Sequence, residues 1–295
     1  MALENITLSD LIEMDRTYVE RIQLRRRILR DHERDTVAAN PIIKPAVNEL
    51  YTWMMGTYLP RRFSRIYKLT RAAGSLYPVL FNTATNETLS ITPPANPVEG
   101  LKILGGNIDS EFLLLLPTAE EGKYRLEGFV TCFPSGFNTR LKLGLNLAGI
   151  HGPVPGYGAK LEKSMDRFFA ALPVGKIVKR ANWSITTNRD LFALSGNHGY
   201  ESEADGVSER EDEEVDVEQC VVRCERQTLH RLPESKALVF AFKTYQYPLS
   251  QIKEEGSAED LCAAIDGLAK GSVPKMSFYK RQVVWGEPVK AYLRG

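Results

Sequence analysis

One histidine of this 295-residue sequence lies where its imidazole can bind a metal. Residues 148–157 place two prolines and three glycines around His151. Prolines restrict φ and remove amide donors, so Pro153 and Pro155 predict a rigid, non-helical loop that holds the ring at little entropic cost. A rigid neutral imidazole is a good ligand for a metal or a haem iron, but a loop histidine is more commonly a hydrogen-bonded structural residue. The pattern by itself leaves both interpretations open.

Other motifs that carry chemistry are missing. Residues 156–160, Gly-Tyr-Gly-Ala-Lys, lack the spacing of a phosphate-binding loop, and neither a dinucleotide fingerprint nor a serine nucleophile elbow is present. Cys220 and Cys224 are separated by three residues and lack the further ligands of a zinc site. On a strand their thiols would share one face, which favours a core role. Kinase, hydrolase and zinc-site functions are therefore disfavoured.

Helices are expected wherever apolar residues recur at helical spacing, which is at residues 7–30, 45–58, 159–172 and 258–270. The second helix is expected to end near Leu59 and Pro60, because a proline disfavours helical geometry in the residue before it. The polar face of the first helix is interpreted as solvated, with docking of an acidic partner as the alternative. That face carries six arginines: Arg16, Arg21, Arg25, Arg26, Arg27 and Arg30.

Strands are expected between these helices. Residues 77–130 contain short runs rich in β-branched and aromatic residues, broken by proline and glycine pairs. The clearest strand patterns lie at residues 124–133, 177–186, 218–223 and 237–245. Strands interrupted by helices, with helical elements at both ends, predict a single α+β domain. Residues 201–218 hold ten acidic residues and one arginine, so a mobile surface loop is expected there. Recruitment of a basic partner is the alternative.

Composition excludes several functional classes. The 38 basic and 37 acidic residues give a net charge of +1, which disfavours a dedicated nucleic-acid binder. The longest apolar runs, residues 112–116 and 237–242, are too short to cross a bilayer. The start of the chain shows no secretory signal, and four cysteines are too few and too irregularly placed for a disulfide framework. A cytoplasmic protein with reduced thiols is expected.

Three blocks of the sequence resemble the haem-dependent oxidative N-demethylase family. They are residues 150–157 (Ile-His-Gly-Pro-Val-Pro-Gly-Tyr), 180–185 (Arg-Ala-Asn-Trp-Ser-Ile) and 223–233 (Arg-Cys-Glu-Arg-Gln-Thr-Leu-His-Arg-Leu-Pro). The order of the three blocks and the spacing between them also fit this family. The resemblance includes residues 14–18, 58–63 and 132–136 and thus covers most of the chain.

The resemblance implies a PAS-like α+β fold, an antiparallel sheet with flanking N- and C-terminal helices. The helical parts would be residues 1–70 and 251–295, and the core would be residues 76–250. It also implies a haem b cofactor and the use of oxygen to demethylate a secondary amine such as dimethylamine, with release of formaldehyde. Electrons would come from NADPH through the flavin and iron–sulfur centre of a separate reductase, because the chain has neither a nucleotide fingerprint nor a cysteine cluster.

Carried over by position, His151 becomes the axial iron ligand. Cofactor contacts are then expected from Pro153, Pro155, Arg180, Asn182, Trp183, Arg226 and Gln227, and catalytic roles from Arg223, Glu225 and Thr228. An arginine can pair with propionates or polarise bound oxygen, and a carboxylate can hold an alkylammonium and take its proton. If residues 218–223 are a strand that runs into a helix, Arg223 and Thr228 both face the cofactor. The alternatives are an arginine–glutamate pair that closes this junction and a core role for the tryptophan.

Two departures from the family pattern bear on the substrate. Phe137 stands where the family leads us to expect a tryptophan, which removes an indole donor. The acidic insertion lies between the second and third blocks, where the substrate carboxylate would be sought. The amine is therefore not determined. A non-catalytic haem-binding sensor or interaction protein is the rival hypothesis, since fold does not determine function. Amine-dependent oxygen consumption would separate the two.

Overall fold

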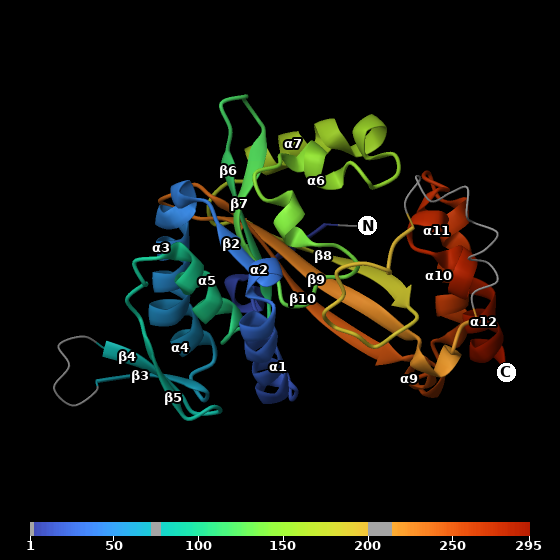
Figure 1. Ribbon diagram of the computed structural model, residues 1–295, viewed down its shortest axis with the longest axis horizontal. Coiled ribbons are helices and arrows are strands. Elements are labelled where there is room, and N and C mark those ends of the chain that lie inside the picture. Colours follow the sequence, from blue (N-terminus) through green and yellow to red (C-terminus); the bar gives the residue numbers. More distant parts are fainter. Residues whose placement is uncertain (1–2, 72–77, 200–213) are drawn as a thin grey trace.

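A seven-stranded antiparallel sheet forms the centre of the protein (Figure 1). The computed structural model describes residues 3–71, 78–199 and 214–295. The strand order is β1-β8-β9-β10-β6-β7-β2. These strands are β1 (Glu4–Ile6), β2 (Val37–Ala39), β6 (Glu111–Pro117), β7 (Tyr124–Val130), β8 (Ile177–Thr186), β9 (Val221–Arg231) and β10 (Leu238–Pro248). The predicted α+β class is confirmed, and the antiparallel sheet draws β1 and β2 from the N-terminal part of the chain.

The three long strands β8, β9 and β10 form a platform. β9 pairs with β10 from Val221 to Arg231 and with β8 from Val221 to His230. Successive side chains of a strand point to opposite faces, and directly paired residues share a face. The register therefore decides which polar side chains of β8 and β9 can meet.

A second sheet of three strands lies at one end of the molecule, at the left of Figure 1. It consists of β3 (Tyr67–Arg71), β4 (Pro78–Asn82) and β5 (Glu87–Ser90). The helices beside it are α1 (Tyr18–Asp31), α2 (Glu33–Thr36), α3 (Lys44–Trp53), α4 (Leu59–Arg62) and α5 (Pro97–Gly105). The C-terminal helices gather at the opposite end of the long strands: α9 (Leu249–Glu254), α10 (Ala258–Lys270), α11 (Met276–Tyr279) and α12 (Gln282–Arg294).

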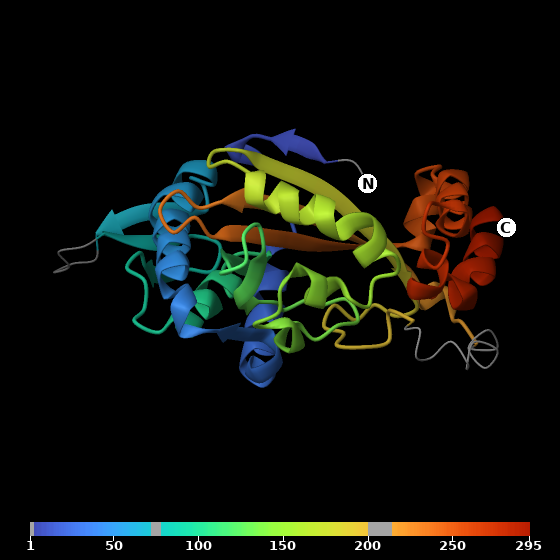
Figure 2. The same cartoon turned by 90° about the horizontal axis from the view of Figure 1, so that it is seen from above.

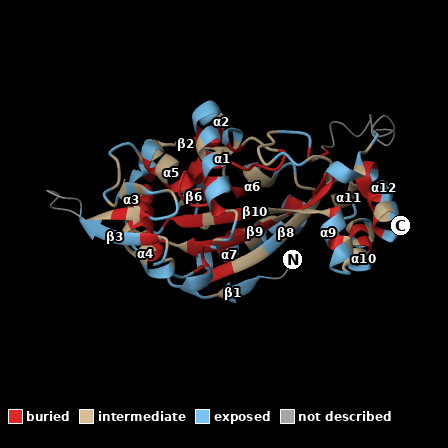
Figure 3. Ribbon diagram, turned by 90° about the horizontal axis from the view of Figure 1, so that it is seen from below, coloured by how far each residue is buried: buried red, intermediate tan, exposed pale blue. Residues whose placement is uncertain are grey.

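Two apolar clusters cover the two faces of the main sheet. We call the face that carries Val178 and Leu229 the front face, and it packs against α6 (Leu147–His151) and α7 (Glu162–Ala171). Helix α7 runs beside β8 in Figure 2. The back face packs against α1, α3 and the segment that precedes α1 through a larger cluster that includes Val239 and Ala241. In Figure 3, buried residues accordingly run along β9 and β10.

Helix α1 begins at Tyr18, so the prediction of one helix over residues 7–30 is wrong at its start. Thr7 instead closes a capping box with Asp10 at a short 3-10 turn, Leu8–Asp10. The residues that follow pack across the back face of the sheet. There, Asp15 accepts a hydrogen bond of 2.7 Å from the buried Lys243. This tertiary contact outweighs the helical spacing of the sequence.

The second predicted helix does not end at Leu59 and Pro60. Helix α3 passes into a π-helical turn, Met54–Tyr58, and then into α4, which contains Pro60 at its start. A proline is tolerated in the first turn of a helix because its missing amide has no intrahelical acceptor there. The π turn thus allows a new helical segment to begin where the first one would have stopped.

The arginine face of α1 is not solvated throughout. Arg25 is 0% exposed and forms two hydrogen bonds to Glu111, at 2.5 and 3.0 Å, as well as bonds to two backbone carbonyls. Arg21 pairs with Asp109 at 2.7 Å. Part of this face therefore ties α1 to the start of β6, because the buried carboxylates there need partners.

Most of the remaining predicted elements agree with the structure, but the strand predicted from residue 218 begins at Val221, because Val217–Gln219 forms a 3-10 turn. β8 and α10 have the predicted bounds, and α7 with its preceding π-helical turn, Tyr157–Leu161, covers the helix predicted at residues 159–172. Helix α5 was not predicted. Most of the acidic segment 201–218 lies outside the described residues. In the part of the chain that the structure describes, no helix is long and apolar enough to span a membrane.

Candidate functional site

The front face of β8 and β9 carries a row of polar side chains in the middle of the sheet. Arg180 is paired with Gln227 and Asn182 with Glu225, so all four side chains share this face. Arg223 lies two residues further along β9 on the same face. Five of the residues predicted from the sequence are therefore brought together by strand alternation.

Helix α6 places His151 near this row. Asn146 caps the helix by accepting a hydrogen bond of 2.9 Å from the amide of Gly149, and Leu147 and Ile150 belong to the front-face cluster. His151 is the last residue of the helix, so the predicted non-helical backbone at the histidine is wrong. Pro153 and Pro155 follow the helix in a turn, where they cannot extend it.

One face of the His151 ring and one of its nitrogens have partners. Nδ1 lies 2.9 Å from the carbonyl of Leu147, and the ring stacks on Tyr157 with centroids 4.7 Å apart. A carbonyl only accepts, so Nδ1 carries the proton and Nε2 presents its lone pair. Burial lowers the pKa of His151 to about 4; the hydrogen bond to Leu147 opposes this change, and the charges of Lys142 and Arg180 contribute to it. The imidazole is therefore neutral at pH 7 and free to bind through Nε2.

Glu225 is a buried carboxylate held by amides. It is 8% exposed, and its Oε2 accepts 2.9 Å from the Nε2 of Gln227 and makes a long contact of 3.5 Å with Asn182. The Oε1 of Gln227 in turn accepts 2.6 Å from the Nε of Arg180. The arginine thus fixes the orientation of the glutamine amide, and the amide fixes Glu225.

Two lysines near Glu225 were missed in the sequence. Lys142 lies in the turn after Asn138, and its Nζ is 4.2 Å from the ring centroid of Phe137. Lys280 lies between α11 and α12, and its Nζ is 5.1 Å from the ring centroid of Trp183. Burial lowers the pKa of each lysine to about 8, and the charge of Glu225 opposes this change in both. No motif links these residues to β9. Only the tertiary structure shows that they are close.

Arg223 fixes two loops over the sheet. Its guanidinium donates to the carbonyls of Phe133 and Asp190 at 2.9 Å each, and to those of Pro134 and Leu191 at 3.1 Å each. Its Nε is buried and has no hydrogen-bond partner among the described residues. A bound ligand could therefore accept a hydrogen bond from this nitrogen.

Three predicted site residues lie on the back face. β9 is one continuous strand, so the predicted turn into a helix after Arg223 is wrong, and Arg223 and Thr228 point to opposite faces. Arg226 pairs there with Glu13 at 2.7 Å. Trp183, cross-strand from Cys224, also belongs to this face and lies beneath Lys280. Strand alternation separates these side chains from His151 and Glu225.

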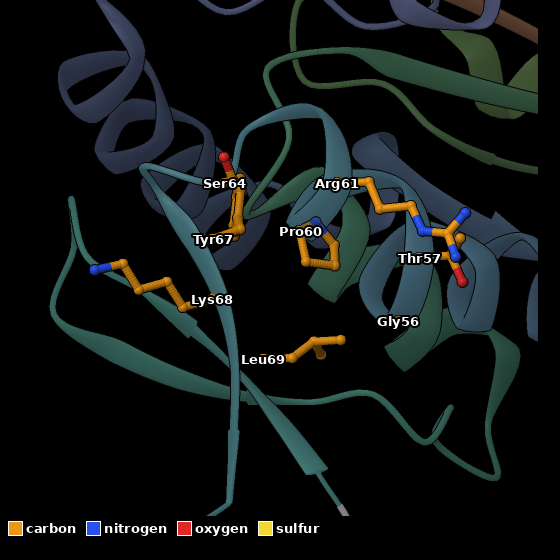
Figure 4. Close-up of a pocket in the computed structure, with 8 residues that line it drawn as sticks. All are labelled: Gly56, Thr57, Pro60, Arg61, Ser64, Tyr67, Lys68 and Leu69. Carbon is orange, nitrogen blue, oxygen red and sulfur yellow. The ribbon is translucent and has the colours of Figure 1, made fainter.

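Two surface pockets lie elsewhere. One of these pockets has a volume of about 410 Å³. The residues that line it, shown in Figure 4, are Gly56, Thr57, Pro60, Arg61, Ser64, Tyr67, Lys68 and Leu69. The other lies beside α7 and is lined by Glu121, Gly122, Lys163, Asp166, Arg167 and Ala170. Neither lining includes a residue predicted from the sequence. Within the described ranges, no three His, Cys, Asp or Glu side chains gather as a multi-ligand metal site would require.

Comparison with protein-family models gives one match over nearly the whole chain. The model described as haem-dependent oxidative N-demethylase, alpha subunit-like, matches residues 2–290. The match includes α6, both polar strands and the C-terminal helices that contribute Lys280.

Proposed function

This chain belongs to the haem-dependent oxidative N-demethylase, alpha subunit-like family, and from that premise we propose that it is a haem enzyme that removes a methyl group from a small secondary amine. The structural observation that carries the proposal is His151, which is half-buried, neutral and bonded through Nδ1 so that Nε2 is free, close to the polar row that contains Glu225. An imidazole nitrogen of this kind suits a haem iron.

The residues present fit a haem. A haem needs an iron ligand, which Nε2 of His151 would supply, and cations for its propionates. Arg180, Lys142 and Lys280 are cations near Glu225, and none has an ion pair with the residues that the structure describes. Tyr157 stacks on the imidazole and would hold the ring in place. When bound, haem supplies the iron at which oxygen is reduced as the methyl group is oxidised.

Glu225 would bind the substrate. A secondary amine is protonated at pH 7, and a buried carboxylate attracts an alkylammonium and can accept its proton. Gln227 and Asn182 donate to Oε2, so Oε1 is left to face the amine. Arg223 would hold the loops at residues 133–134 and 190–191 over the site and so exclude water from it.

The overall reaction requires a source of electrons. The methylated amine, oxygen, two electrons and two protons give the demethylated amine, formaldehyde and water. The sequence has no dinucleotide fingerprint and no iron–sulfur cysteine cluster. We therefore propose that NADPH supplies the electrons through the flavin and iron–sulfur centre of a separate reductase.

The visible spectrum of the purified protein tests the first half of the proposal. We expect a Soret band in protein produced with a haem precursor, and loss or displacement of this band in His151→Ala. The exposed His32 provides a matched control, since His32→Ala should retain the parent spectrum. A colourless parent that takes up no added haem would refute the proposal.

Amine-dependent formaldehyde release tests the second half. With a surrogate electron donor, the haem-loaded parent should consume oxygen and release formaldehyde when dimethylamine is added. Glu225→Gln should bind haem as the parent does but lose most of this activity. Haem binding without any amine-dependent oxygen consumption would favour the sensor hypothesis instead.

A further inference from the structure

Besides Arg223, whose guanidinium binds backbone carbonyls, three cations of the candidate site have no anionic partner among the described residues. Lys142, Arg180 and Lys280 each lie within range of the charge of Glu225, yet no nitrogen of theirs forms an ion pair within 4.0 Å in the described part of the chain. Burying a charge without a partner is costly, and proteins seldom retain such charges unless a ligand neutralises them.

Each of the three cations is held by a neutral contact. Arg180 donates through Nε to the side chain of Gln227 at 2.6 Å, which leaves its two terminal amino groups free. Lys280 donates to the backbone carbonyl of Trp183 at the exposed edge of β8. Lys142 lies over an aromatic ring. These contacts position the cations but leave most of their donors unused.

Buried polar atoms on the front face also lack partners among the described residues. Thr244 is the cross-strand neighbour of Glu225 on β10, is 1% exposed, and its hydroxyl has no hydrogen-bond partner. The Nε of Arg223 and the Nε2 of Gln246, which are cross-strand neighbours two residues further along, are unpaired as well. Such atoms are rare in a protein interior and indicate a missing ligand or water. This second observation is independent of the three cations.

We propose that Lys142, Arg180 and Lys280 form a carboxylate-binding set around Glu225, which Lys280 approaches from the edge of β8. The inference rests on the proposed function and extends it. Together with Arg223, these cations outnumber the single carboxylate of Glu225, and this excess of positive charge suits a ligand that carries carboxylates. Arginine and lysine form strong charge-assisted hydrogen bonds with carboxylates, so the set has the required chemistry.

Two sources can supply the carboxylates. The first is the pair of haem propionates, which are both negatively charged. The second is a substrate such as N,N-dimethylglycine, whose ammonium group would meet Glu225 while its carboxylate meets a lysine. The two sources differ in which ligand loses affinity when a lysine is neutralised.

Haem binding measured by Soret titration tests the first source. The probes are haemin and its dimethyl ester, which lacks the charges of the propionates. We expect Lys142→Met and Lys280→Met each to raise the Kd of haemin about tenfold, the size of one lost charge-assisted hydrogen bond, and to leave the Kd of the ester unchanged. Lys142→Arg keeps the charge and should restore tight binding. Lys176→Met is the control, because Lys176 is exposed and lies outside the site.

The second source is tested by spectral titration of the haem-loaded protein with N,N-dimethylglycine and with dimethylamine. If the substrate carboxylate is the ligand, both lysine variants bind haemin normally but bind N,N-dimethylglycine about tenfold more weakly, with no change for dimethylamine. A far-ultraviolet circular dichroism spectrum identical to that of the parent excludes misfolding of the variants.

The outcomes separate this inference from the proposed function. If the parent binds haemin and neither lysine variant weakens any of the four probes, the carboxylate-binding set is refuted and the haem proposal stands. If the parent binds neither haemin nor its ester, both proposals fall together.

Discussion

Replacement of His230 by phenylalanine is expected to make the folded state less sensitive to acid. His230 is 6% exposed, its ring centroid lies 6.0 Å from that of Trp53, and neither ring nitrogen has a hydrogen-bond partner in the described part of the chain. Burial lowers the pKa of His230 from 6.5 to about 4, although the charge of Glu49 opposes this change. The folded protein therefore keeps this ring neutral under conditions where the unfolded chain protonates it.

The sign and size of the effect follow from proton linkage. Between pH 6.5 and pH 4 the unfolded state binds more protons at this residue, so stability falls as the pH falls through that window. Full protonation of His230 in the unfolded state lowers the free energy of unfolding by about 3 kcal/mol, and about 2 kcal/mol of this loss occurs as the pH falls from ~7.5 to ~5. The pKa of His151 and that of His198 are also lowered to about 4 by burial, but both residues are the same in the variant and the parent. Comparison of the two proteins therefore isolates His230.

Urea unfolding followed by tryptophan fluorescence measures this difference. The free energy of unfolding of the parent should fall between pH ~7.5 and pH ~5 by about 2 kcal/mol more than that of His230→Phe. His32→Phe, at an exposed histidine, should behave as the parent does. If His230→Phe loses as much stability as the parent, the imidazole is not kept neutral by burial and the reasoning fails.

Three further substitutions test the packing and the site. Arg25→Met should lower the free energy of unfolding, measured by chemical denaturation, by about 3 to 5 kcal/mol, because it leaves the buried Glu111 without its partner. A loss below about 1 kcal/mol would contradict this expectation. Gly105→Ala should lower the free energy of unfolding by about 1 to 3 kcal/mol in the same assay, because the new Cβ would lie 2.4 Å from a methyl group of Val130. An unchanged denaturation midpoint would show instead that α5 can shift to accommodate the methyl group. Gln227→Leu removes the amide that orients the carboxylate of Glu225. It should weaken dimethylamine binding about tenfold in spectral titration and leave haem affinity unchanged. An equal loss of amine and haem affinity would indicate general disruption of the site.

The contacts of Lys280 show how the C-terminal helices take part in the candidate site. Lys280 belongs to the C-terminal helical region, yet its side chain reaches the edge of β8 beside the site. Trp285 donates through Nε1 to the backbone carbonyl of Lys280 at 2.9 Å and so helps fix this lysine from within α12. The C-terminal helices therefore complete the candidate site as well as packing against the end of the sheet.

Local sequence patterns were sufficient to predict most elements. Apolar spacing and β-branched runs predicted the bounds of β8 and α10 correctly, because periodicity reports directly on which residues face a core. The resemblance in three short blocks agreed with the family match over residues 2–290. The pattern around His151 also marked a histidine that the structure half-buries and keeps neutral, and the sequence named Glu225 and Gln227, which the structure joins by a hydrogen bond.

Long-range packing decided the rest. Whether β9 continued past Arg223 determined which of its side chains face α6, and no local signal distinguished a continuing strand from a helix there. Arg25 became fully buried because α1 lies across the start of β6, although its helical position predicted a solvated face. Lys142 and Lys280 lie 83 and 55 residues from Glu225 in the sequence and have no motif in common with it. Their proximity depends on strand register and helix packing, which arise from contacts between distant segments. The sequence alone therefore marked His151 as a candidate iron ligand, but only the tertiary structure brought the charged side chains close to Glu225.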